Sequence, residues 1–310
     1  MPRYHVYRSN QINATPQKVF DTISDFRTWT TWSPWLGAEP DAKVTVTENA
    51  SSIGSIYSWQ GELVGQGEIE HRDLQPGRLI KEEIRFLKPF KSKSEVAFEM
   101  ELVGDGTKLT WHMRGALPWF LFWMKPQMEV FIGMDYERGL KMLKELLETG
   151  QILSETKIRG VEPVGPLRMA GVRKKYSLND IGPSMAAMLA DATEKFSKHN
   201  LPTDGEPMSV YHDFDMKSGI FDYTAGFALP ESVGSVSEEL SCWSLSATKA
   251  LRVDHIGSYE NLGNAWSAAN QFARYKKLKQ SKAGAFEIYK NNPNDTSPAD
   301  LRTEISLPLR

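Results

Sequence analysis

Ala285-Phe286-Glu287-Ile288-Tyr289, near the C-terminus of this 310-residue chain, is the stretch that decides how its second half folds. Side chains alternate along a strand, so Glu287 and Tyr289 share one face, and Phe286 and Ile288 share the other. Both faces are therefore expected to be covered at least in part. Burying a carboxylate among such neighbours is costly unless it has a partner, an altered pKa or a ligand. The alternative is an edge-strand glutamate that points to water.

The second half of the chain repeats itself around this stretch. Tyr211 and Pro230 lie 19 positions apart, and so do Tyr289 and Pro308. Each copy is expected to contain a strand, a helix and two further strands. The expected strands are 167–176, 208–212 and 221–229 in the first copy, and 247–255, 285–289 and 301–307 in the second. Two such modules would pair around a pseudo-two-fold axis, with both helices on one face of a sheet and a cleft near the axis.

The repeat also identifies the first-copy counterpart of Glu287. Counting back from the two landmark tyrosines leads to Ser209. The module therefore does not need a carboxylate at this strand position in order to fold. This asymmetry favours a role for Glu287 in the cleft.

The first half has a different order of elements. A strand around 4–13 precedes a helix that begins at Thr15-Pro16, because a hydroxyl caps the helix and proline needs no N–H in its first turn. Between 43 and 115 the pattern changes to period two, which predicts about six antiparallel strands. Residues 119–149 then predict a long helix that ends at Gly150. Its apolar stripe is expected to comprise Met128, Phe131, Ile132, Leu140, Leu143 and Leu147. Burying that stripe against a curved sheet would leave a cavity between them.

An apolar run at 117–124 precedes this long helix. It contains Pro118 and is far shorter than the roughly 20 residues that a membrane-spanning helix needs. The alternatives for this run are the mouth of a cavity, a lid, an oligomer contact, and plain packing of the helix start.

Charge and cysteine content exclude several classes of protein. The net charge is -2 and neither half is basic, so the phosphate-neutralising surface of a nucleic-acid-binding protein is missing. The single Cys242 cannot form an internal disulfide or a cysteine-rich metal site. The six histidines include no pair at metal-ligand spacing. We expect a bacterial cytoplasmic protein without cofactor, metal, secretory signal or membrane span, and its oligomeric state stays open.

Several motifs of the first half occur together: Asn13-Ala14-Thr15-Pro16, Ile23-Ser24-Asp25-Phe26, Trp32-Ser33-Pro34-Trp35, Gly65-x-Gly67, Gly106-Thr107 with Trp111, and the stretch from Gly133 to Leu140. With them residues 3–149 resemble the START-like, or SRPBCC (polyketide cyclase/dehydrase-like), superfamily. This resemblance implies a helix-grip fold with a deep apolar tunnel, and it fixes no chemistry. Candidate polar residues for the tunnel are Glu68, Glu70, His71, Glu99, Glu101 and His112.

The second half carries His255-x-Gly257-x-Tyr259-x-x-Leu262, Trp266, Phe286-Glu287-x-Tyr289 with Asn291-Asn292-Pro293, and Leu301-x-Thr303-Glu304-Ile305-x-x-Pro308. With these motifs residues 157–310 resemble the GyrI-like domain, which is also the effector-binding domain of multidrug-sensing transcription regulators, including AraC-type regulators. The resemblance implies that Glu287 contacts cationic, hydrophobic ligands in an aromatic pocket beside Tyr289. Tyr259, Trp266 and Tyr211 are the further candidate ligand-binding residues. A branch of this family hydrolyses strained electrophiles with the corresponding glutamate.

The sequence therefore predicts an α+β chain with a helix-grip domain at 1–150 and a duplicated GyrI-like domain at 157–310. The leading hypothesis is a sensing or xenobiotic-handling protein that binds hydrophobic, aromatic or cationic small molecules at Glu287. One alternative is a hydrolase in which Glu287 is the general base and Tyr289 or Tyr259 donates or orients a proton. The other is a transcription co-regulator that acts through a partner, because no helix-turn-helix pattern is visible.

Overall fold

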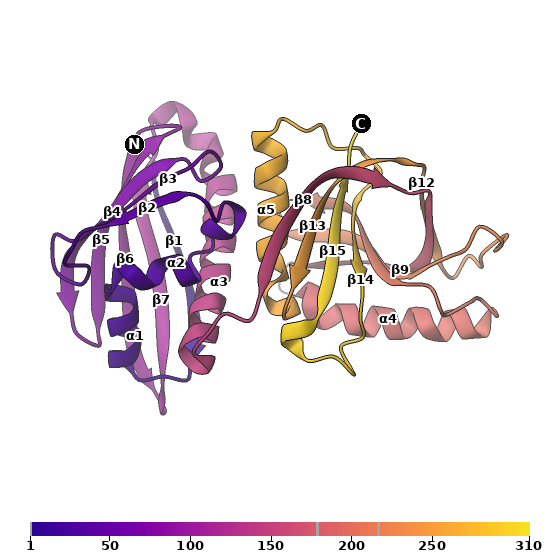
Figure 1. The fold of residues 1–310 in the computed structure, drawn as a ribbon, viewed down its shortest axis with the longest axis horizontal. Helices are drawn as coiled ribbons and strands as arrows, with labels where there is room; N and C mark the ends of the chain where they lie inside the picture. Colours follow the sequence, from indigo (N-terminus) through magenta and orange to yellow (C-terminus); the bar gives the residue numbers. More distant parts are fainter. Residues whose placement is uncertain (1, 178–179, 216–217) are drawn as a thin grey trace. The chain divides into compact units, whose positions relative to one another are not determined.

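The computed structural model describes residues 2–177, 180–215 and 218–310 (Figure 1). The chain divides into two compact units, unit 1 at Met1–Leu153 and unit 2 at Ser154–Arg310. Each unit is built on one antiparallel sheet, so the α+β fold class predicted from the sequence is confirmed. Among the described residues, no helix has both the length and the apolarity needed to cross a membrane.

Unit 1 is a seven-stranded sheet in the order β1-β7-β6-β5-β4-β3-β2, with a long helix. Its strands are β1 (Arg3–Ile12), β2 (Lys43–Val46), β3 (Ile56–Gln60), β4 (Gln66–Gln75), β5 (Leu79–Lys88), β6 (Ser92–Val103) and β7 (Gly106–Ala116). Its helices are α1 (Pro16–Ser24), α2 (Trp29–Trp32) and α3 (Lys125–Thr149), with the 3₁₀ turns η1 (Phe26–Thr28), η2 (Leu36–Ala38) and η3 (Trp119–Met124). The six strands expected between 43 and 115 are all present.

Local signals begin and end the helices of unit 1. The Thr15 side chain accepts the N–H of Lys18, and Pro16 stands in the first turn of α1. Helix α3 ends at Gly150, whose φ of 84° lies in the left-handed region that favours glycine. The helix predicted at 119–149 is present: its first six residues form the 3₁₀ helix η3, and α3 continues directly from it.

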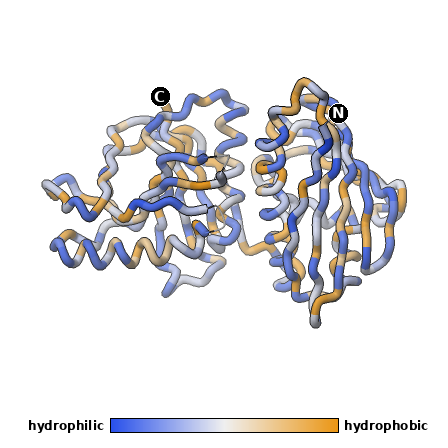
Figure 2. The backbone as a smooth tube through the Cα atoms, turned by 180° about the vertical axis from the view of Figure 1, so that it is seen from behind, coloured by the Kyte–Doolittle hydropathy of each residue, from blue (hydrophilic) through white to orange (hydrophobic). Residues whose placement is uncertain are grey.

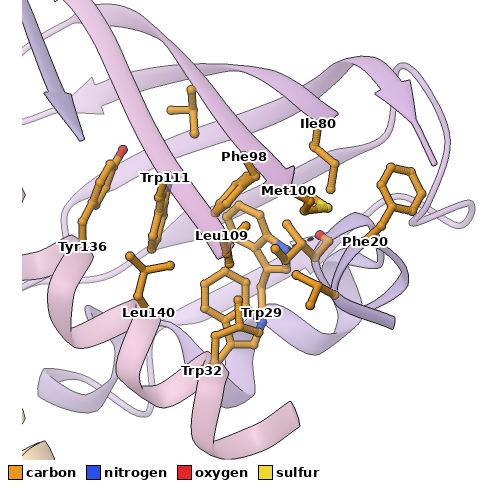
Figure 3. Packing of buried hydrophobic residues seen from close by; sticks show 14 of the residues in the cluster. Phe20, Trp29, Trp32, Ile80, Phe98, Met100, Leu109, Trp111, Tyr136 and Leu140 are labelled. Atoms are coloured by element: carbon orange, nitrogen blue, oxygen red, sulfur yellow. Dashed lines mark hydrogen bonds between the residues drawn. The ribbon is translucent and has the colours of Figure 1, made fainter. Parts of the chain in front are cut away.

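Large aromatic side chains fill much of the space between the sheet of unit 1 and its helices (Figure 3). Trp111 of β7 stacks on Tyr136 of α3 with 4.0 Å between ring centroids, and it meets Trp32 of α2 edge to face. Leu140 of the predicted apolar stripe is buried against them. Phe131, which was expected on the same stripe, is exposed, so this part of the prediction is wrong.

Unit 2 is an eight-stranded sheet in the order β12-β9-β11-β10-β14-β15-β13-β8. Its strands are β8 (Glu155–Val164), β9 (Leu167–Ser177), β10 (Pro207–Asp215), β11 (Ile220–Ala228), β12 (Ser241–Leu245), β13 (Thr248–Ile256), β14 (Ala285–Tyr289) and β15 (Arg302–Pro308), and its helices are α4 (Ile181–Lys198) and α5 (Leu262–Tyr275). The copies β9-α4-β10-β11 and β13-α5-β14-β15 meet at β10 and β14. The pseudo-two-fold axis therefore lies between these two central strands.

Each copy is extended by one further strand that crosses to the other copy. Strand β8 precedes the first copy and pairs with β13 of the second, whereas β12 precedes the second copy and pairs with β9 of the first. The five-residue strand β12 was not predicted, because it is short and carries no clear pattern. This exchange of strands ties the two copies into one sheet.

The two faces of the central strands are covered differently. Helix α4 packs on β9 and β11, and α5 packs on β13, β15 and β8. On the opposite face Phe286 and Ile288 of β14 form one apolar cluster with Trp243 of the edge strand β12 and Val164 of the edge strand β8. The sheet is therefore curled, and β14 is covered on both faces.

Candidate functional site

Glu287 lies at the centre of the unit 2 sheet, directly opposite Ser209 across the pseudo-two-fold axis. The repeat in the sequence predicted this pair of counterparts. Glu287 is only 1% exposed. The alternative of an edge-strand glutamate pointing to water is therefore wrong.

Both carboxylate oxygens of Glu287 accept hydrogen bonds from aromatic side chains. The indole N–H of Trp266, on α5, donates to Oε1. The hydroxyl of Tyr289, two residues along β14, donates to Oε2 over 2.6 Å. The Tyr211 side chain, on β10, also favours the ionised form of this carboxylate. Two uncharged donors, one from α5 and one from β14, thus hold the side chain in place.

The rings of these residues and of Tyr259 surround the carboxylate. Tyr211 meets Trp266 edge to face, with 5.1 Å between ring centroids. Tyr259 meets Tyr289 in the same way over 5.7 Å. Tyr211, Trp266 and Tyr259 are only partly buried, whereas Tyr289 is buried. The structure thus brings together the five residues that the sequence nominated.

Residues from the first copy complete the surroundings. The Tyr289 hydroxyl lies 3.1 Å from Ser209 Oγ. The Ser209 hydroxyl in turn donates to Met185 Sδ over 3.0 Å. Tyr223 lies opposite Tyr211 in the β10–β11 pairing, and their rings stack. Sequence reasoning did not name Met185 or Tyr223 as site residues. The register of the β10–β11 hairpin is the signal that would have found Tyr223.

Burial controls the electrostatics of this cluster. It raises the pKa of Glu287 above the ordinary glutamate value, while the hydrogen bonds from Tyr289 and Trp266, and the nearby Tyr211 side chain, act in the opposite direction. Burial, followed by the nearby Glu287 charge, holds the pKa of Tyr211 and of Tyr289 well above the usual tyrosine value. Across the described residues, no lysine, arginine or histidine is among the groups that stabilise the Glu287 charge.

This arrangement offers two kinds of chemistry. A carboxylate without a cationic partner attracts a ligand cation, and the surrounding rings can contact that cation through their faces. The same carboxylate can take up a proton while the Tyr289 hydroxyl supplies one. For a metal ion, the described residues offer no suitable group of three histidine, cysteine or acidic side chains.

Of the six polar residues considered for the interior of unit 1, His71 alone lies there. Its ring stacks on Phe26 with 3.9 Å between centroids, and its Nε2 lies 2.9 Å from the Ser24 carbonyl oxygen. Glu82 of β5 is also buried, with Oε1 3.1 Å from His71 Nδ1, and burial raises its pKa. Sequence reasoning missed Glu82, although the alternation Ile80-x-Glu82 points it to the same face as a core residue.

The other five of these residues lie on the opposite face of the sheet, so their prediction as tunnel residues is wrong. Strand pairing puts Glu68 and Glu70 beside Arg85, which binds both. A groove of about 590 Å³ on this outer face is lined by residues that include Glu99, Glu101 and His112.

Family models match both halves of the chain. Residues 161–310 match the model described as a GyrI-like small molecule binding domain. Residues 3–148 match the model described as polyketide cyclase / dehydrase and lipid transport. The chain carries one domain of each family. Unit 2 is accordingly its GyrI-like domain, and unit 1 its polyketide cyclase-like domain.

The solved structures that this chain matches share little sequence with it. The Aha1 dimer from Colwellia psychrerythraea is 16% identical, and the match covers 47% of this chain and 98% of Aha1, with a TM-score of 0.36. CalU16 from Micromonospora echinospora is 17% identical over 48% of this chain and 87% of CalU16, with a TM-score of 0.34. EcmrR, in a complex with DNA, is 16% identical over 61% of this chain and 70% of EcmrR, with a TM-score of 0.42. No curated protein matches the sequence.

Proposed function

We propose that the GyrI-like domain binds hydrophobic cationic or aromatic small molecules, with Glu287 as the counter-charge. The observation that carries this proposal is a buried carboxylate whose two hydrogen-bond donors, Trp266 and Tyr289, are both uncharged aromatic side chains. Burying a charge without a counter-charge is costly, so a ligand cation would be stabilised at this position. Cation–π contacts with the surrounding rings would contribute ~0.5–2 kcal/mol each. A protein with this site would sense or sequester foreign hydrophobic compounds.

In this proposal a ligand cation competes with Trp266 for the carboxylate. Trp266 is partly exposed, and its N–H occupies Oε1 of Glu287. A cation that approaches past α5 therefore exchanges the indole hydrogen bond for a direct charge–charge contact. Tyr289, which is buried, keeps its hydrogen bond to Oε2 in the bound state.

The experiment that tests this function uses two ligands of nearly the same shape. Benzyltrimethylammonium carries a positive charge, and neopentylbenzene does not. Calorimetric titration should show that the protein prefers the cation, and Glu287→Gln should abolish the preference without preventing the neutral compound from binding. Glu206→Gln, which changes a carboxylate at the surface of the same unit, is the matched control. Equal affinities of the parent protein for both compounds would contradict the proposal.

A second candidate function is hydrolysis, which the 2.6 Å hydrogen bond from Tyr289 to Glu287 favours. In this reaction Glu287 takes a proton from water while the water oxygen bonds to an electrophilic carbon. The leaving oxygen takes the Tyr289 proton, and Tyr289 recovers a proton from Glu287. Incubation with styrene oxide tests this candidate. If the protein is a hydrolase, it should convert styrene oxide to the diol, and Glu287→Gln and Tyr289→Phe should each abolish this activity. If the site only binds ligands, the parent protein should form no diol.

A further inference from the structure

Turn η3, at the start of α3, exposes four aromatic rings. Trp119 is 75% exposed and Trp123 is 63% exposed, and Phe120 and Phe122 between them are also exposed. No residue of η3 is buried. Plain packing of the helix start, one of the alternatives for this run, therefore accounts for Leu117, which packs against the core of unit 1, but not for these exposed rings. A contiguous group of exposed aromatic rings indicates an interaction surface.

The turn between β5 and β6 lies at the same end of unit 1. Ser94 of β6 pairs with Gly115 of β7, and η3 follows the end of β7 after two residues. The pairing of β6 with β7 therefore places the turn 89–91 close to η3. Phe90 in that turn is 80% exposed. Strand β1 begins at this same end of unit 1, because Arg3 pairs with Ala116 at the end of β7. In Figure 2 the tube near the label N includes segments coloured as hydrophobic residues.

Cations accompany these exposed rings. Lys88, Lys91 and Lys93 flank Phe90 and are all exposed. The acidic side chain that follows in β6, Glu95, is 3.4 Å from Arg114, which balances its charge. The surface formed by η3 and the β5–β6 turn is thus apolar with a positive rim. Aromatic rings beside lysines are the combination that suits the interface of an anionic bilayer, where rings sit at the headgroup level and ammonium groups meet phosphates.

We propose that η3 and the β5–β6 turn dock the polyketide cyclase-like domain onto an anionic lipid surface. A second copy of the chain fits this surface less well. In a two-fold dimer the same patch meets itself, so Lys88, Lys91 and Lys93 of the two copies would be brought together and repel each other. A lipid surface instead supplies the opposite charge. This inference concerns unit 1 and is independent of ligand binding at Glu287.

Co-sedimentation of the full chain with vesicles tests the proposal. We expect binding to vesicles of phosphatidylserine and phosphatidylcholine, and much weaker binding to phosphatidylcholine alone. Replacing Lys88, Lys91 and Lys93 by glutamine should weaken binding to anionic vesicles roughly 100-fold, because each cation contributes roughly five-fold. Glutamine at Lys276, Lys279 and Lys282, three exposed lysines of unit 2, should leave it unchanged.

The aromatic rings provide a second, separate measurement. The double variant Trp119→Ser, Trp123→Ser should weaken vesicle binding by roughly ten-fold or more, since both rings leave the interface. Leu102→Ser changes an exposed apolar residue at the opposite end of β6 and is the matched control. The proposal is overturned if the parent protein does not bind anionic vesicles. It is equally overturned if the lysine variant and the tryptophan variant both bind these vesicles as tightly as the parent protein. It is also overturned if analytical ultracentrifugation without vesicles shows a dimer that dissociates when the two tryptophans are replaced. The surface would then be a contact between copies of the chain.

Discussion

Trp266→Phe tests whether the indole hydrogen bond stabilises the buried charge of Glu287. The substitution removes the N–H that Glu287 Oε1 accepts, and it keeps an aromatic ring against Tyr211. A hydrogen bond to a charged group contributes about 1.5–3 kcal/mol. The smaller ring also loses packing, so the single variant alone does not isolate the hydrogen bond.

A double-mutant cycle with Glu287→Gln removes the packing contribution, because the ring change is the same in both backgrounds. In the glutamine background the indole donates to a neutral acceptor, and such a bond contributes about 0.5–1.5 kcal/mol. We therefore expect a coupling energy of about 1–2 kcal/mol between the two substitutions. Amide hydrogen exchange of β10 and β14 at about pH 8 reports the opening free energy of unit 2 itself.

Trp243→Phe is the control for this cycle. Its indole N–H donates to the neutral Ala283 carbonyl, in the apolar cluster on the other face of the sheet. It should show no coupling to Glu287→Gln. A coupling energy below about 0.5 kcal/mol for Trp266, or an equal value for Trp243, would refute the view that Trp266 holds the Glu287 charge.

Three further predictions concern stability. Because the pKa of Glu287 is raised, the folded state binds the proton of the Glu287 carboxyl group more tightly than the unfolded state does. The stability of unit 2 should therefore fall as pH rises above the ordinary glutamate pKa of 4.5. Glu287→Gln should flatten this pH dependence, as measured by hydrogen exchange. Glu82→Ala leaves His71 Nδ1 without the carboxyl group beside it and should cost unit 1 about 1–3 kcal/mol in urea unfolding followed by tryptophan fluorescence; a loss under about 0.5 kcal/mol would contradict a stabilising contact between these two buried side chains. Gly139→Ala would place a Cβ 2.7 Å from the Trp111 ring and should cost about 1–3 kcal/mol, whereas Gly37→Ala meets no atom within 4 Å and should be neutral.

The duplication was readable from the sequence because equal spacing between landmark residues survives in the chain itself. It identified Ser209 as the counterpart of Glu287, and the β10–β14 pairing puts the two residues opposite each other. It also gave the strands and helices of both copies. Strand β12 was missed because its role depends on pairing with a strand of the other copy.

Which face of the unit 1 sheet a side chain occupies was harder to predict. Glu68 and Glu70 point outward and Glu82 inward, and that difference depends on strand register and not on residue type. The contact between Trp266 and Glu287 joins residues 21 positions apart and depends on how α5 is rotated on the sheet. Helical periodicity likewise placed Phe131 on the buried stripe of α3, where it is exposed.

The most direct test of the central claim is a carbon-13 NMR titration of the Glu287 carboxyl group, assigned with Glu287→Gln, in the absence and presence of benzyltrimethylammonium. Without ligand, we predict a pKa above the ordinary glutamate value of 4.5, because the group is buried without a cationic partner. A bound cation should lower that pKa, because an opposite charge favours the ionised form. A Glu287 pKa that stays the same at saturating benzyltrimethylammonium would contradict the role of this carboxylate as the counter-charge.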